Sequence, residues 1–181
     1  MDAFDYLFSF YGLLLGIAVA NVAIGFADMW RDSQRIRVGV CPPLLACIVL
    51  AGCMNIWLTL WRIHPDTGIN GLQMLAAAAV ALPYVFVSRA MFPSLGSEQT
   101  PSLEAHYLDN RALILGLLVI PAVSSTISKL FLDQVKDHGW ALAWLALRVP
   151  MPLVLIPIKN LKFQRVGLGA FLALELVGLF R

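Results

Sequence analysis

The chain has 181 residues, of which 60% are hydrophobic and 13% are charged, and its net charge is +2. A soluble domain carries about 25% charged residues, so this chain has too little charge to cover a surface that faces water. The composition excludes an ordinary soluble protein, and the small net charge gives no reason to expect a nucleic-acid partner. We therefore expect an integral membrane protein whose partner is the lipid bilayer, with one transmembrane domain over residues 1–181.

Six apolar stretches follow one another along the chain, separated by short polar connections. A helix needs about 20 apolar residues to span the hydrocarbon core of a bilayer. The first stretch begins after acidic residues and continues to Trp30, so we expect a spanning helix there and not a cleaved leader. The fold class predicted is all-α, a polytopic bundle of about six transmembrane helices at residues 7–29, 42–61, 72–92, 111–131, 140–158 and 163–180.

The longest connection, residues 93–110, divides the chain into two sets of three segments. Two three-helix halves would cross the membrane in opposite directions, the inverted topology found in many transporters. Few identities accompany an alignment of the two halves, and any six-helix chain divides in this way. Inverted halves and a simple six-helix chain therefore both stay open as interpretations.

Basic residues predict the orientation of the bundle. Most lysines and arginines fall in or beside the connections after the first, third and fifth segments. By the positive-inside rule this side is cytoplasmic, which places both termini in the periplasm if the membrane is a bacterial inner membrane. The basic residues on this side are Arg31, Arg35, Arg37, Arg89, Arg111, Lys159, Lys162 and Arg165.

Small residues repeat at four-residue spacing in the first segment, at Gly12, Gly16 and Ala20. Such a ridge lets helix backbones approach closely in lipid, where no hydrophobic force drives helices together. We expect a tight helix contact inside the bundle, with a subunit interface as the alternative.

Two charged residues lie inside the expected membrane segments, Arg148 in the fifth and Glu175 in the sixth. Charges at such depth are costly, and they usually find a partner and mark a functional site. Counting 1.5 Å per residue places both in the outer half of the membrane, at a depth also reached by Asn55, Ser124 and Ser125. One interpretation is a ligand or ion pathway, in which Arg148 holds an anionic group and Glu175 balances it. The other is a structural ion pair that fixes helix packing.

Further polar residues are secondary candidates for the same pathway. Tyr11 reaches the outer polar layer, whereas Asn21 and Asp28 share a face of the first helix in the inner half. For Asp28 we favour a local ion pair with Arg31. Tyr84, toward the inner end of the third segment, is read as an interfacial anchor.

The densest polar stretch, residues 103–111, precedes the fourth segment. Its Glu104, His106 and Asp109 could form a regulatory or docking site. The favoured alternative is a short amphipathic helix whose Asp109 and Asn110 satisfy the start of the fourth helix.

The sequence lacks a complete catalytic or cofactor motif. All three histidines fall in loops, which disfavours haem held inside the membrane, and the signatures of zinc proteases, serine hydrolases and phosphate loops are absent. Cys41, Cys47 and Cys53 are spaced six apart and share no helix face. We therefore expect no enzyme, no cofactor and no metal site.

The leading functional hypothesis is a small membrane transporter or channel-like protein that binds or passes a small ion or solute. Because six helices are few to enclose a pore, a homo-oligomer is expected. The alternative is a non-transporting membrane scaffold or sensor subunit that docks a partner through its basic cytoplasmic loops.

Overall fold

The computed structural model describes residues 3–31, 37–63, 71–93, 102–131 and 138–180. Within these ranges all regular secondary structure is helical, and the one extended pairing is an isolated bridge between Arg37 and Ser102. The prediction of an all-α chain is confirmed. The Arg37–Ser102 bridge ties the chain before the second helix to the residue that precedes the fourth.

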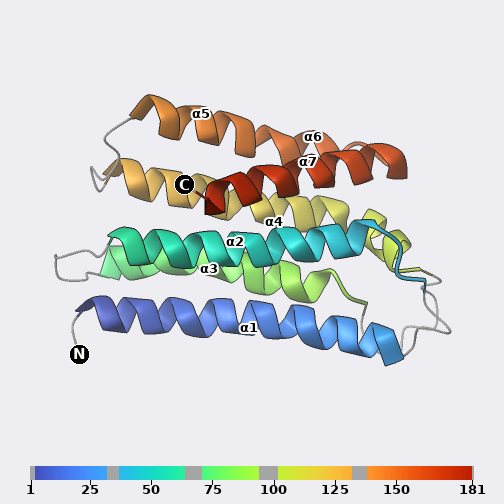
Figure 1. Cartoon of the computed structure of the whole chain (residues 1–181), viewed down its shortest axis with the longest axis horizontal. Coiled ribbons are helices and arrows are strands. Elements are labelled where there is room, and N and C mark those ends of the chain that lie inside the picture. Colours follow the sequence, from blue (N-terminus) through green and yellow to red (C-terminus); the bar gives the residue numbers. More distant parts are fainter. Residues whose placement is uncertain (1–2, 32–36, 64–70, 94–101, 132–137, 181) are drawn as a thin grey trace.

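Over the described residues the chain forms seven helices, and because α5 and α6 lie end to end, these make six rods that run side by side and alternate in direction (Figure 1). Both ends of the chain lie toward the same end of the bundle (Figure 1). The helices α5 and α6 follow each other along one rod. In chain order the helices are α1 (Ala3–Arg31), α2 (Cys41–Ile63), α3 (Gly71–Ala90), α4 (Leu103–Phe131), α5 (His138–Arg148), α6 (Pro150–Leu155) and α7 (Leu161–Leu179).

Within the part of the chain that the structure describes, three helices are long and apolar enough to cross a membrane, over Asp5–Arg31, Cys41–Trp61 and Leu103–Ser124. Two shorter apolar helices cover Met74–Ala90 and Ala143–Leu155. The sequence-predicted segments therefore coincide with helices, and three of them meet the full requirement for a membrane span.

The fifth predicted segment is interrupted at Val149, between α5 and α6. Pro150 and Pro152 have no backbone N–H, so the carbonyls of Ala146 and Arg148 lose their usual helical partners. Val149 keeps helical angles (φ −77°, ψ −46°), and its N–H still donates to the Leu145 carbonyl at 3.0 Å. The interruption therefore changes the hydrogen bonding of the rod without turning the chain away from it.

The helices pack around a shared apolar core. Helix α1 lies along α3, α3 along α4, and α2 along α7, while α5 and α6 pack against α4. The helix contacts differ between the two three-segment halves of the chain. Over the described residues α1 and α3, the first and third segments, lie close together, whereas α4 and α7, the fourth and sixth segments, are much less closely packed. The largest fully buried side chains include Tyr107, Phe171, Leu45, Ile48, Met91 and Leu115.

The small-residue ridge of α1 does not make the predicted tight contact inside the bundle. Gly16 and Ala20 are exposed, and a Cβ atom on Gly16 would meet nothing within 4 Å. The buried face of α1 is instead that of Leu15 and Ala18, which lies on another side of the helix. Which face is buried depends on the neighbouring helices, and small residue size alone did not identify it.

The polar stretch before the fourth segment is part of α4, which begins at Leu103, eight residues before the predicted start. The Ser102 hydroxyl accepts a hydrogen bond from the Ala105 N–H at 3.1 Å, so Ser102 caps the helix. This corrects the assignment of that role to Asp109 and Asn110. The Asn110 side chain instead donates to the His106 carbonyl at 3.0 Å.

Candidate functional site

Arg148 and Glu175 form a two-pronged ion pair between α5 and α7. The guanidinium donates from Nε to Oε1 and from Nη2 to Oε2, each at 2.7 Å. Arg148 is the last residue of α5, one position before the proline-rich interruption. The sequence placed these two residues at similar depth and left open whether they pair, and the structure shows that they do.

Asn55 brings α2 into the same group. Its side-chain amide donates to the Glu175 carboxylate at 3.0 Å and to the Glu175 backbone carbonyl at 2.8 Å. Gly178, close to one turn further along α7, leaves room for this approach, because a Cβ atom there would make a tight contact of 3.1 Å with the Asn55 amide nitrogen. Sequence reasoning predicted Asn55 at this depth and missed the role of Gly178.

Tyr84 of α3 is the fourth member. Its hydroxyl is hydrogen-bonded to the Arg148 side chain, and the residue is 3% exposed. Gly52 of α2 leaves space for it, since a Cβ atom there would lie 2.6 Å from the hydroxyl oxygen. The reading of Tyr84 as an interfacial anchor is therefore wrong. The segment predicted at residues 72–92 has its midpoint at residue 82, so Tyr84 lies closer to the middle than to the inner end, and this position was the signal that could have found it. We call Arg148, Glu175, Asn55 and Tyr84 the polar cluster.

The remaining residues of the predicted outer layer are less closely tied to this cluster. Tyr11 of α1 is buried in the apolar core of the bundle, and Ser124 of α4 is half-buried. The side chain of Ser125 lies outside the described residues. Their predicted part in a pathway stays a prediction.

In the inner half, Asn21 of α1 forms a hydrogen bond to α3. Its side-chain amide donates to the Ser88 hydroxyl of α3 at 3.2 Å, and that hydroxyl donates to the Val85 carbonyl at 2.8 Å. Asp28 and Arg31 are both described, and no ion pair joins them. The predicted local ion pair of Asp28 is therefore wrong, and Asn21 serves to link α1 to α3.

A second ion pair lies at the opposite end of α7, where Arg165 meets Glu104 of α4 at 3.2 Å. The Glu104 carboxylate also accepts from the N–H groups of Val40 and Cys41 at 2.9 and 3.3 Å. These are donors at the start of α2, which a helix leaves without intrahelical partners. Glu104 thus ties together the beginnings of α2, α4 and α7, a role that the sequence pattern did not indicate.

The charges of the polar cluster are balanced and its two ionic members differ in access. The Glu175 side chain is 2% exposed and that of Arg148 is 14% exposed. No buried side-chain nitrogen or oxygen in the described part of the chain lacks a hydrogen-bond partner. A buried pair of this kind is costly to break, because removal of one partner leaves the other charged and unsolvated. The Arg148 side is the one from which a competing anion could approach.

The described residues contain no group of three or more potential metal ligands. The polar cluster itself offers a guanidinium, a carboxylate, an amide and a phenol, a set suited to binding a small polar or anionic group. Function has to be argued from this geometry, because a fold alone does not specify it. No protein-family model matches the chain, and no curated protein or solved structure matches it significantly.

Proposed function

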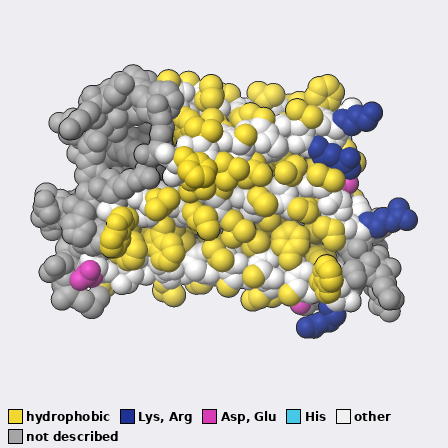
Figure 2. Space-filling model, in the orientation of Figure 1, with side chains coloured by type: hydrophobic (Ala, Val, Ile, Leu, Met, Phe, Trp, Pro, Cys, Tyr) yellow, Lys and Arg dark blue, Asp and Glu magenta, His cyan; other side chains and the backbone are white. Residues whose placement is uncertain are grey.

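We propose that all six rods cross a membrane. Large apolar side chains are exposed along the helices, among them Leu13, Phe86 and Val166, and apolar side chains cover the visible face between the two ends of the bundle (Figure 2). The described lysines and arginines visible on this face lie at one end (Figure 2), as expected if the positively charged end is cytoplasmic. Both termini are then periplasmic in a bacterial inner membrane, and alkaline phosphatase fused to the C-terminus should be active.

Within that bundle we propose that the polar cluster binds or passes a small ion or solute. The observation that carries this proposal is an Arg–Glu unit to which four helices contribute, with the Arg148 side chain 14% exposed. A small anion that competes for Arg148 would displace the Glu175 carboxylate and loosen the contact between α5 and α7. Because intramembrane charges are expensive, they are retained mainly where such a role needs them. A homo-oligomer would supply the additional helices that a pore requires.

Flux through the purified protein in liposomes tests this proposal. Monovalent ions, protons and small anions form the panel, and the Arg148→Ala variant is compared with wild type. Arg89→Ala is the matched control. Arg89 is exposed on α3, and its substitution removes the same charge at a position away from the polar cluster. Flux that is lost in Arg148→Ala protein shown to be folded by circular dichroism, and kept in Arg89→Ala, supports the proposal. Equal flux in all three proteins refutes it.

The complete pairing of the polar cluster favours a second candidate, a non-transporting scaffold or sensor subunit. A scaffold needs a dry core and a functional surface at its end, and the exposed basic residues at one end of the bundle could form that surface. The two candidates differ in the same experiment. Folded wild-type protein that passes none of the species would favour the docking role.

A further inference from the structure

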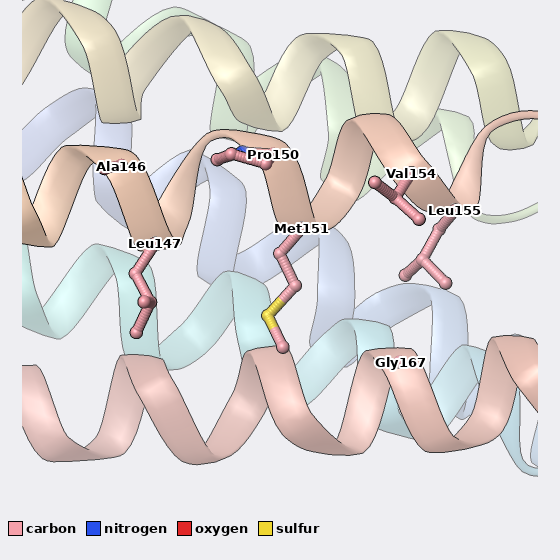
Figure 3. A pocket seen from close by; sticks show the side chains of 7 residues that line it. All are labelled: Ala146, Leu147, Pro150, Met151, Val154, Leu155 and Gly167. Atoms are coloured by element: carbon pink, nitrogen blue, oxygen red, sulfur yellow. The ribbon is translucent and has the colours of Figure 1, made fainter.

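An open apolar groove runs along the side of the bundle between α5–α6 and α7 (Figure 3). Its volume is about 340 Å³. Leu147, Met151 and Leu155 extend from α5 and α6 toward α7, where Gly167 forms the opposite wall (Figure 3). A Cβ atom on Gly167 would collide with the Leu155 side chain, so the absence of a side chain there lets the helices approach. The other lining residues are Ala146, Pro150 and Val154.

The chemistry of this lining selects an apolar occupant. It contains no charged or hydrogen-bonding side chain, and a cavity without polar partners does not hold ordered water. If the bundle crosses a membrane, as proposed above, the open side of the groove faces hydrocarbon. A lipid acyl chain then matches both the lining and the surroundings of the groove.

Two exposed lysines, Lys159 and Lys162, lie near one end of the groove and favour a negatively charged occupant there. Leu155 lines the groove and is the last residue of α6, and Lys159 follows four positions later in the connection to α7. Lys162, in the first turn of α7, lies about 8 Å along the helix axis from Gly167 and about 140° around it, so it flanks the end of the groove and does not line it. Both lysines are exposed, and among the described residues neither forms an ion pair, whereas the nearby Arg165 is already paired with Glu104.

We propose that this groove is a binding site for an anionic phospholipid, with one acyl chain between α6 and α7 and the headgroup phosphate at Lys159 and Lys162. The proposal rests on the membrane placement of the bundle and is independent of transport. A basic residue near a headgroup contributes about a fivefold preference for anionic lipid, corresponding to roughly 1 kcal/mol per charge. The two lysines should together favour phosphatidylglycerol over phosphatidylcholine by at least tenfold.

Native mass spectrometry of the purified full chain, equilibrated with equal amounts of these two lipids, measures that preference. The Lys159→Gln/Lys162→Gln variant should lose most of the preference. The Ala146→Phe variant, which fills the groove, should retain less of either lipid. Ala170→Phe on the exposed surface of α7 controls for added bulk, and Arg37→Gln/Arg89→Gln controls for the loss of two charges at the same end. Both controls should behave as wild type.

Three results would overturn the proposal: equal retention of the two lipids by wild type, undiminished retention by Ala146→Phe, or an equal loss of preference in the arginine control. The last would show a general attraction of the basic end for anionic lipid. Circular dichroism confirms that each variant is folded. Co-flotation with phosphatidylcholine vesicles tests the membrane placement separately, so its failure is distinguishable from failure of the lipid site.

Discussion

Replacing Arg148 with alanine is expected to destabilise the protein strongly. The change removes both guanidinium contacts at 2.7 Å and leaves the Glu175 side chain, which is 2% exposed, without its charged partner. Breaking a buried ion pair from one side costs about 3–5 kcal/mol, because the remaining charge is neither paired nor hydrated. For a chain of this size each 1 kcal/mol lowers Tm by about 2–4 °C, so Arg148→Ala should lower Tm by about 6–20 °C.

A double-mutant cycle separates the pair from the general cost of truncation. Tm and the free energy of unfolding in mixed micelles are measured for Arg148→Ala, Glu175→Gln and the double variant. We expect the second change to recover at least half of the loss, since it removes the unpaired carboxylate. Effects that simply add would show that the two residues are not energetically coupled, which would refute the reasoning from the ion pair.

Three further predictions concern the contacts around the two ends of α7. Tyr84→Phe should lower the free energy of unfolding by about 1 kcal/mol through loss of the hydroxyl bonded to Arg148, and thermal unfolding in detergent measures it. Gly52→Val should lower the free energy of unfolding by about 1–3 kcal/mol, because the valine side chain meets the Tyr84 ring. The double variant Gly52→Val/Tyr84→Ala should have a higher Tm than Gly52→Val alone. A lower Tm would contradict the clash. Glu104→Ala should lower the free energy of unfolding by about 0.5–2 kcal/mol, because it removes the hydrogen-bond acceptor at the start of α2. We expect faster hydrogen exchange at the Cys41 amide. Unchanged exchange would count against the capping role.

The polar cluster was partly predictable because helical rise fixes the depth of a residue without knowledge of its neighbours. Arg148, Glu175 and Asn55 were placed at one level in this way, and hydrogen bonds join them. Tyr84 was missed because aromatic residues are common at membrane surfaces, and that expectation was given more weight than its position in the segment.

Features that depend on which helices are neighbours were not predictable from the pattern. The ridge containing Gly16 could have faced any side, and the structure leaves it exposed, whereas Gly25 meets Phe92 across a close contact. Glu104 reaches the start of α2 only because the chain before α2 returns beside Ser102. The periodicity of the sequence shows neither the path of the chain before α2 nor which helix faces contact each other, so both had to come from the structure.

Helix α7 is fastened at two points, to α5 through Glu175 and to α4 through Arg165. These residues are ten positions apart, which is about 15 Å along the helix axis. A rod held in this way cannot slide lengthwise without straining both attachments together. If one ion pair is lost, the other pair and the packing of α7 along α2 still hold the helix at its level in the bundle.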